Sequence, residues 1–194
     1  MGGVVCGIDE AGRGPWAGPV VAAAVILDHA RVPPGINDSK QLTPAAREEL
    51  FQALMSCASI GVGFASVSEI DSINILQATL RAMERAVAAL PRAPNAALVD
   101  GNRLPQLRCP ALAVVRGDGR SLSIAAASII AKVTRDRLMR DLAREYPAYG
   151  WERNKGYGTN VHAVALARHG VTPHHRLSFG PVHRAKTQHV DLSL

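Results

Sequence analysis

The chain has 194 residues, 47% of them hydrophobic and 20% charged, which is enough to bury the core of one domain and argues against disorder. Its net charge of +6 favours nucleic acid over an acidic protein as partner, although a plain soluble basic domain would carry the same charge. We recognise neither a signal peptide nor an apolar run that could span a bilayer. Cys6, Cys57 and Cys109 lie far apart without a C-x-x-C spacing, so we expect free thiols in a cytoplasmic protein and no thiolate zinc site.

Strands and a helix are predicted to alternate in the first part of the chain. Residues 4–8 form a short apolar, β-branched run typical of a buried strand, and the valine-rich residues 17–27 predict a second, longer strand. Thr43 and Pro44 provide the N-cap and a proline at the first position of a helix. Residues 60–64 alternate between large apolar and small side chains, which predicts a third strand.

A long helix is predicted to follow. Ser68 and Asp71 have a spacing that suggests a capping box at its start. Apolar residues then recur at steps of three and four from Ile73 to Leu90, and Pro91 stops the helix. We interpret this stripe as ordinary core packing by one face of the helix.

The remaining elements complete an α/β order. Residues 96–99 and 112–115 predict two further strands, and an alanine-rich helix is predicted over residues 121–145. A final helix is predicted between residues 160 and 169. Neighbouring strands joined by tight turns are antiparallel, whereas helical crossovers join parallel strands, so the sheet should be mixed. No repeat or linker is visible, and we expect residues 1–194 to form a single domain.

Four acidic residues stand at predicted strand ends: Asp9, Glu10, Asp100 and Asp118. Active sites in open α/β sheets commonly lie at the carboxyl ends of strands. Two unit charges about 4 Å apart repel by roughly 4 kcal/mol at an effective dielectric of ~20, so gathered carboxylates need protons or a divalent cation. Oxygen-only ligands suit Mg²⁺ or Mn²⁺ better than Zn²⁺, and two such ions can support phosphodiester hydrolysis. Each acid alone also fits ordinary turn chemistry, an alternative that the adjacent pair Asp9 and Glu10 makes less convincing.

The sequence around these acids resembles ribonuclease HII. The matching segments follow one another in the same order over nearly the whole chain, and we find no departure at the positions that carry the family's chemistry. The segments are residues 9–15 (DEAGRGP), 18–20 (GPV), 37–42 (NDSKQL), 99–101 (VDG), 117–118 (GD), 123–136 (SIAAASIIAKVTRD) and 155–159 (KGYGT).

This resemblance implies a fold and a reaction. The fold would be ribonuclease H-like, with a mixed five-stranded sheet flanked by helices and a C-terminal helical segment. Asp9, Glu10, Asp100 and Asp118 would be the catalytic and metal-binding residues, with Mg²⁺ or Mn²⁺ as cofactor and two ions during catalysis. The implied reaction is endonucleolytic hydrolysis that leaves a 5′-phosphate and a 3′-hydroxyl.

The resemblance also implies how the substrate is recognised. The main chain of a Gly-Arg-Gly loop would read a ribose 2′-hydroxyl, the group that distinguishes RNA from DNA, and glycines allow the backbone to approach the sugar closely. A tyrosine would lie at the RNA–DNA junction, and a serine and two lysines would contact phosphates. These substrate-binding residues are Gly12, Arg13, Gly14, Ser39, Lys40, Lys155 and Tyr157.

The expected substrates are RNA–DNA hybrids and duplex DNA with an embedded ribonucleotide, bound by a monomer without a membrane. One alternative is a nucleic-acid-binding protein without catalysis, although clustered acids would repel phosphates unless metal intervened. Another is a different nuclease of the same fold, which need not combine the Gly-Arg-Gly loop with Tyr157.

Arg135 lies on the predicted 121–145 helix as a phosphate contact or a solubilising residue. The histidines lack a helical His-x-x-x-His pair, so we do not expect them to bind metal, and Trp16 and Trp151 should pack in the core.

Overall fold

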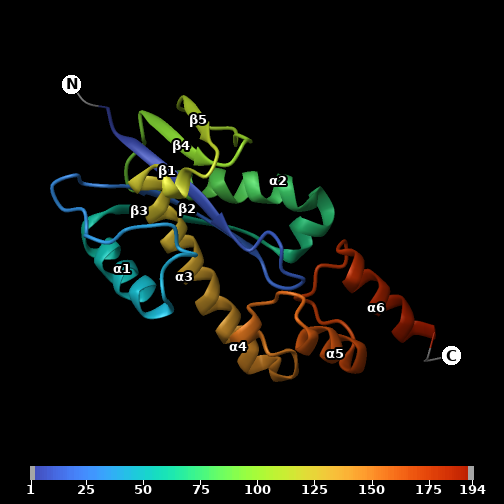
Figure 1. Cartoon of the computed structure of the whole chain (residues 1–194). Coiled ribbons are helices and arrows are strands. Elements are labelled where there is room, and N and C mark those ends of the chain that lie inside the picture. The colour runs from blue at the N-terminus through green and yellow to red at the C-terminus, as the bar shows by residue number, and fades with distance from the viewer. Residues whose placement is uncertain (1–2, 192–194) are drawn as a thin grey trace. The chain divides into compact units, whose positions relative to one another are not determined.

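The computed structural model describes residues 3–191, and the side chains up to Thr187. Figure 1 labels its helices and strands. In chain order the elements are β1 (Val5–Ala11), β2 (Val20–Ile26), α1 (Pro44–Cys57), β3 (Ser59–Ala65), α2 (Val67–Ala88), β4 (Ala96–Asp100), β5 (Ala111–Val114), the 3₁₀ helix η1 (Gly117–Gly119), α3 (Leu122–Glu145), the 3₁₀ helix η2 (Pro147–Tyr149), α4 (Trp151–Asn154), α5 (Asn160–His169) and α6 (Gly180–Asp191).

The described residues fall into two compact units, which we describe separately. Unit 1 comprises the described residues of Met1–Ala11, Val21–Phe64 and Thr79–Thr134. Unit 2 comprises those of Gly12–Val20, Ala65–Ala78 and Arg135–Leu194. That residues 1–194 form a single domain stays a prediction.

The strands form one mixed five-stranded sheet, as the sequence predicts, and their order in it is β3-β2-β1-β4-β5. Strand β1 pairs antiparallel with β2, to which a short loop connects it, and parallel with β4, which follows a helical crossover. Strand β5 pairs in parallel with β4. The prediction ended β1 at residue 8, but the strand continues to Ala11 because its pairing with β2 extends from Gly7↔Val25 to Ala11↔Val21.

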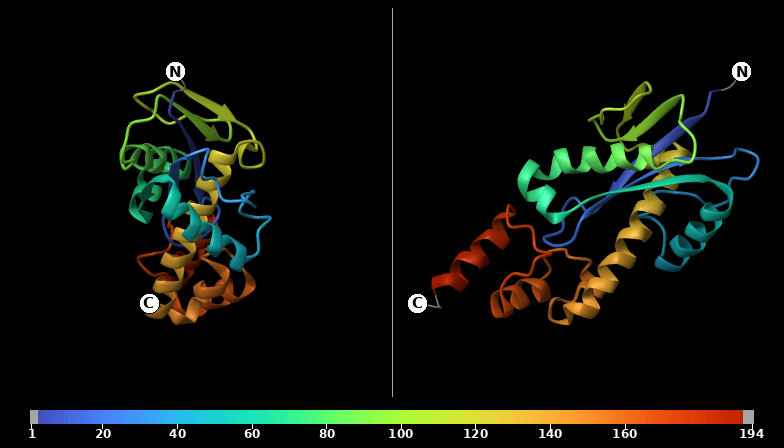
Figure 2. Two further views of the ribbon diagram at one scale, coloured as in Figure 1. Left: turned by 90° about the vertical axis from the view of Figure 1, so that its left-hand side faces the viewer. Right: turned by 180° about the vertical axis from the view of Figure 1, so that it is seen from behind.

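In unit 1, helices cover both faces of strand β3. Figure 2 shows these helices on the two sides of the strand. Ile60 and Val62 point to a core that α1 and α3 build with the sheet. Gly61 and Gly63 point the other way, where an added Cβ would lie 2.1 Å from a backbone carbonyl oxygen of α2. The alternation of large and small residues therefore specifies a strand and also leaves room for α2 to pack directly on its backbone.

The start of α2 differs from the prediction. Ser66 accepts a hydrogen bond from the Glu69 N–H at 3.2 Å, and Glu69 Oε2 accepts one from the Ser66 N–H at 2.9 Å, so these two residues form the capping box. The prediction of Ser68 and Asp71 is wrong because β3 ends at Ala65 and the helix begins directly afterwards.

The apolar stripe of α2 conceals a break. Asn74 has φ 67° and ψ 164°, which is not helical, and its side chain accepts hydrogen bonds from the N–H groups of Leu76 and Gln77 at 3.0 and 3.1 Å. Asn74 thus acts as the N-cap of a second helical segment. Apolar periodicity on either side of the break continues, so periodicity alone could not reveal it.

Unit 2 is built around an aromatic core. Trp151 is fully buried, and Trp16 packs against the same cluster, as the sequence predicts for both. Helix α5 has the predicted bounds, and Thr159 caps it by accepting from the His162 N–H at 3.4 Å. The prediction that this is the final helix is wrong, because α6 follows; its sequence is mostly polar and gives little apolar periodicity.

Two further expectations concern the whole described chain. All three cysteines are free, as predicted. Within residues 3–191, no helix combines the length and the apolar character that crossing a membrane requires.

Candidate active site

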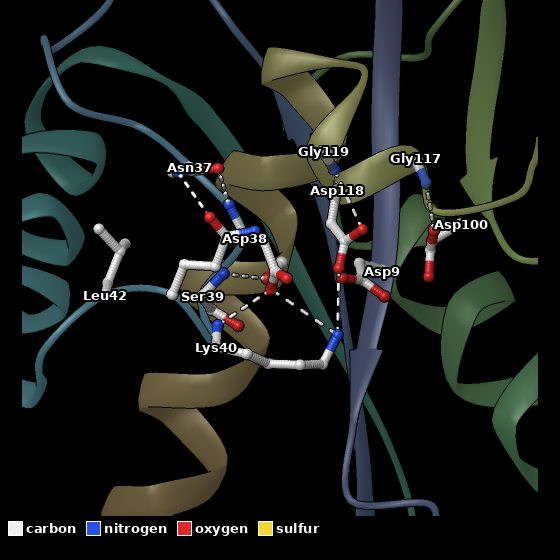
Figure 3. A network of polar contacts seen from close by, with 12 residues as sticks. Asp9, Asn37, Asp38, Ser39, Lys40, Leu42, Asp100, Gly117, Asp118 and Gly119 are labelled. Atoms are coloured by element: carbon white, nitrogen blue, oxygen red, sulfur yellow. Dashed lines mark hydrogen bonds and ion pairs between the residues drawn. The ribbon is translucent and has the colours of Figure 1, made fainter.

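Three carboxylates meet at the edge of the sheet in unit 1. Asp9 lies within β1 and Asp100 is the last residue of β4, while Asp118 lies in η1. Because Ile8 of β1 pairs with Val99 of β4, the register places Asp9 and Asp100 at neighbouring positions, and Figure 3 shows them side by side with Asp118. One carboxylate oxygen from each residue lies within 4.8 Å of the other two. The structure thus brings together three of the four acids that the sequence singles out.

Glu10 lies outside this triad of Asp9, Asp100 and Asp118. It follows Asp9 inside strand β1, not after the strand as predicted, and successive side chains of a strand point to opposite faces. Its charge still acts on Asp9. A metal-binding role for Glu10 stays a prediction.

Backbone amides orient all three carboxylates. The Glu10 N–H donates to Asp9 Oδ1 at 2.7 Å. The Gly117 N–H donates to Asp100 Oδ1 at 2.7 Å, and the Gly119 N–H donates to Asp118 Oδ1 at 3.0 Å. A Cβ on Gly117 would lie 2.5 Å from the side chain of Ile124, so the η1 turn closes tightly against α3. The triad is therefore held in place by the main chain.

The electrostatics of the triad favour bound positive charge. Burial, followed by the charges of Glu10 and Asp100, raises the pKa of Asp9 well above its usual value, and a backbone hydrogen bond lowers it only in part. Lys40 Nζ lies 3.0 Å from Asp118 Oδ2 and 3.7 Å from Asp38 Oδ1 (Figure 3). Partial burial lowers the pKa of Lys40, but the hydrogen bond and the charge of Asp118 outweigh it, so this pKa is raised. An ammonium group thus already occupies one side of the triad.

The residues present fit a divalent cation. The donors are carboxylate oxygens alone, which hard cations such as Mg²⁺ and Mn²⁺ prefer. Two of them, Asp9 and Asp118, are 5% and 8% exposed, so water screens their repulsion poorly. A bound cation would relieve a repulsion that Lys40 compensates only in part, since its ammonium bonds directly to Asp118 and acts on Asp9 through its charge alone.

Ser39 and Lys40 are placed by a loop that is anchored to α1 and α3. The Ser39 N–H donates to Ser128 Oγ at 3.1 Å, and Arg47 Nε donates to the Ser39 carbonyl at 2.8 Å. Ser39 is buried, whereas the Lys40 side chain is 76% exposed. Of this pair, the Lys40 side chain is the one that a ligand can reach.

Unit 2 brings the Gly-Arg-Gly loop next to the predicted junction tyrosine. A Cβ on Gly14 would lie 3.4 Å from Cε1 of Tyr157, which places this glycine beside the aromatic ring. Tyr157 is 46% exposed, and Arg13 is exposed as well. Gly12 has φ 97°, a conformation that favours glycine. Lys155 instead folds back, and its ammonium donates to the carbonyl of Glu152.

Several buried polar residues of unit 2 were not expected from the sequence. Arg135 is 1% exposed, so it is neither a surface phosphate contact nor a solubilising residue, and Arg176 is fully buried. His162 and His175 are buried with their Nε2 atoms 3.0 Å apart. A helical arginine looks like a surface residue in sequence, and only the tertiary contacts reveal its environment.

Comparisons with known proteins identify the family. The family model for ribonuclease HII matches residues 6–182. Ribonuclease HII of Ruegeria pomeroyi is 61% identical over 181 residues, which cover 93% of this chain and 77% of that protein. Ribonuclease HII of Paramagnetospirillum magneticum is 62% identical over 186 residues, or 94% of this chain and 92% of that protein. The chain belongs to the ribonuclease HII family.

Solved structures agree with this assignment. Ribonuclease H2 of Pyrococcus horikoshii superposes with a TM-score of 0.79 at 28% identity and covers 95% of this chain and 97% of its own. RNase HII of Archaeoglobus fulgidus, solved in a complex with PCNA, has a TM-score of 0.76 at 26% identity. The match covers 91% of this chain and 95% of that one. The fold is that of ribonuclease H, and the protein is a ribonuclease H acting on RNA paired with DNA. Family membership decides against both alternatives raised from the sequence.

Proposed function

We propose that this enzyme hydrolyses the RNA strand of RNA–DNA hybrids and also cuts on the 5′ side of a single ribonucleotide in duplex DNA, leaving a 5′-phosphate and a 3′-hydroxyl. The observation that carries the proposal is the triad of Asp9, Asp100 and Asp118, whose oxygens converge within 4.8 Å. Clustered carboxylates repel a phosphodiester unless a cation lies between them. The site is therefore suited to metal-assisted hydrolysis.

Mg²⁺ or Mn²⁺ is the cofactor that the donor set supports. The three triad residues would hold it, with Glu10 as a further ligand, and we propose two ions during catalysis. When bound, the ions supply a water of lowered pKa as nucleophile and stabilise the leaving oxygen. The backbone amides that hold Asp9, Asp100 and Asp118 keep the carboxylates in one geometry. Such preorganisation lowers the cost of rearrangement during the reaction.

The remaining residues of the proposal bind the substrate. The 2′-hydroxyl would be read by the main chain of Gly12, Arg13 and Gly14, and the ring of Tyr157 would pack on the sugar that follows the ribonucleotide. Support comes from the position of Gly14, on which an added Cβ would lie 3.4 Å from the Tyr157 ring, and from the exposure of that ring. We further propose that Ser39, Lys40 and Lys155 contact the phosphate backbone, for which the exposed side chain of Lys40 is the strongest support.

The setting in which the enzyme works is also a proposal. A net charge of +6 suits a duplex substrate whose backbone is anionic. Three free cysteines suit a reducing compartment, and we propose that the enzyme acts in the cytoplasm as a monomer.

One cleavage experiment tests the proposal. Three duplexes of the same sequence are incubated with Mg²⁺, Mn²⁺ or EDTA: all-DNA, DNA with one ribonucleotide, and a long RNA–DNA hybrid. We expect cuts in the two ribonucleotide-containing duplexes only, and only when a divalent cation is present, with products that carry 5′-phosphates. Comparable cutting of all-DNA would contradict ribose recognition, and cleavage in EDTA would contradict the metal mechanism.

A further inference from the structure

Two buried guanidinium groups of unit 2 bind neutral carbonyls. Arg135 and Arg176 are 1% and 0% exposed. Burial lowers the pKa of Arg135 to about 10, and burial together with the charge of Arg135 lowers that of Arg176 to about 9. Both values lie above neutrality, so both side chains remain cations. Burying a cation is costly unless its N–H donors form hydrogen bonds. The acceptors of these hydrogen bonds therefore show what each arginine holds in place.

Arg176 binds the loop that contains the Gly-Arg-Gly sequence. Its Nη2 donates to the carbonyl of Gly12 at 2.6 Å, Nη1 to that of Arg13 at 2.9 Å, and Nε to that of Gly18 at 2.9 Å. Its own N–H also donates to the carbonyl of Trp16 at 2.8 Å. A planar fork of donors can hold several carbonyls in one plane, which the single ammonium of a lysine cannot do.

These bonds determine the direction of the loop's amides. The chain has no cis peptide bond among the described residues, and in a trans peptide the C=O and the following N–H point in opposite directions. Because the carbonyls of Gly12 and Arg13 point to Arg176, the N–H groups of Arg13 and Gly14 point away from it. Arg13 and Gly14 are the exposed residues of the loop. A cation bound to a carbonyl also polarises the same peptide group and makes its N–H a stronger donor.

Arg135 connects this loop to the segment that carries Tyr157. Its Nη2 and Nε donate to the carbonyls of Ala17 and Pro19 at 3.0 Å each, and its Nη1 donates to the carbonyl of Lys155 at 2.9 Å. A Cβ on Gly12 would lie 2.0 Å from Arg135 Nε, so the guanidinium packs directly beneath the loop. One side chain thus fixes the loop and the tyrosine-bearing segment together.

We propose that Arg176 and Arg135 are positioning residues for ribose recognition. Arg176 aims the Arg13 and Gly14 amides outwards, towards the oxygen of a ribose 2′-hydroxyl or its neighbouring phosphate, and Arg135 holds the Tyr157 segment in register with them. The inference rests on the proposed function, because it presupposes that this loop and Tyr157 read the sugar. In this proposal, two buried cations that do not themselves reach the substrate determine the shape of the surface that recognises the ribose.

Conservative variants test the proposal. Arg176→Lys and Arg135→Lys keep the charge but lose the fork, and Arg168→Lys at an exposed position of α5 is the matched control. For each, kcat/KM is measured on the single-ribonucleotide duplex and on the long hybrid, at a temperature at which circular dichroism shows a folded protein. Loss of folded enzyme lowers both values equally. A misaligned loop should lower the single-ribonucleotide value by at least about tenfold more than the hybrid value, since only one ribose is available there.

A second readout follows the amides themselves. We expect the ¹H–¹⁵N resonances of Arg13 and Gly14 to move in Arg176→Lys and to stay in place in Arg168→Lys. If an arginine variant does not fold, Asp71→Asn tests the same linkage, because Asp71 accepts from the N–H groups of Leu177 and Ser178, directly after Arg176. It should shift the substrate ratio in the same direction by a smaller factor.

The outcomes separate this inference from the proposed function. If the wild type cuts all-DNA as well as ribonucleotide-containing duplex, the proposed function is wrong. If the wild type discriminates and the folded variants keep its ratio between the two substrates, the positioning role is overturned and the proposed function stands. A lowered ratio in Arg176→Lys or Asp71→Asn, with Arg168→Lys unchanged, supports the positioning role.

Discussion

The carboxylate triad of unit 1 and the arginine pair of unit 2 both contain buried charged groups, but these groups have different partners. Asp9, Asp100 and Asp118 converge with like charge, and one ammonium group compensates part of it. Arg135 and Arg176 each donate three hydrogen bonds to neutral carbonyls. The triad retains negative charge that a cation can compensate, whereas the N–H donors of the guanidinium groups form hydrogen bonds inside the protein. A ligand site such as the triad thus keeps charge without a partner inside the protein, whereas a rigid support such as the arginine pair has partners for its donors.

The largest expected effect comes from removing a charge from the triad. Asp9→Asn or Asp100→Asn should lower the single-turnover cleavage rate by roughly a thousandfold or more, since a metal contributes several kcal/mol and each 1.36 kcal/mol is tenfold in rate. Substrate affinity, measured by fluorescence anisotropy, should change little because phosphate contacts remain. Asp141→Asn is the control, with a side chain that is 67% exposed. Turnover within about tenfold of wild type in a folded Asp9 or Asp100 variant would exclude a catalytic triad.

The comparison also predicts which unit responds to metal. Mg²⁺ or Mn²⁺ at a hundredfold excess over its dissociation constant should stabilise the wild type by about 2.7 kcal/mol, because it binds only the folded site. The measurement is thermal or urea unfolding with and without the ion. Asp9→Asn should lose most of this gain, while Arg176→Lys should keep it. An equal gain in wild type and Asp9→Asn would place the ion elsewhere.

Tyr157 tests the exposed part of the recognition surface. Tyr157→Ala should lower kcat/KM on the single-ribonucleotide duplex by roughly tenfold, since an aromatic contact with a nucleotide contributes on the order of 1–3 kcal/mol. Tyr157→Phe keeps the ring and should retain most of the activity. The melting temperature should change little in either variant, because the ring is 46% exposed. Equal effects of alanine and phenylalanine, or unfolding of the alanine variant, would make Tyr157 a structural residue.

The last expected effect is on stability and not on activity, and it concerns a second network in unit 2 whose polar groups bind one another. The Thr172 N–H donates to His175 Nδ1 at 3.0 Å, so the proton of His175 lies on Nε2 and can be donated to His162 Nε2 at 3.0 Å. His162 Nδ1 can then donate to the carbonyl of Tyr157 at 3.0 Å. Both rings are neutral in this arrangement. Burial, followed by the charges of His162 and His174, lowers the pKa of His175 to about 3.

This network should make the fold sensitive to acid. The folded-state pKa of His175 lies below its unfolded value of about 6.5, so the unfolded state binds the proton first and stability falls as the pH drops from there towards about 3. The loss should approach roughly 1.4 kcal/mol per pH unit for this group. Urea unfolding between about pH 7.5 and 5 measures it. His175→Gln should flatten the slope, and His183→Gln, at an exposed position, should not. Identical slopes in both variants would exclude the network as the cause.

The sequence by itself predicted most of the helices and strands and suggested a metal site. Residues 4–8 and 60–64 predicted strands, Thr43 and Pro44 predicted the start of a helix, and the acids predicted a metal site. These features are visible in the sequence because short-range periodicity, capping and turn chemistry depend on neighbouring residues. The family resemblance added the fold and the activity, which the comparisons confirm.

Only the tertiary structure decided which side of the sheet each acid faces and which charged groups are buried. Asp9 joins the triad and Glu10 does not because β1, paired with β2, continues through both residues, and successive side chains of a strand point to opposite faces; the local sequence does not reveal where the strand ends. The break at Asn74 interrupts a helix whose apolar stripe continues across it. Arg176 and the carbonyl of Gly12 are 164 residues apart in sequence, yet they share the shortest of the six hydrogen bonds that the Arg135 and Arg176 side chains donate. Such contacts depend on where whole elements pack, so no local pattern in the chain encodes them.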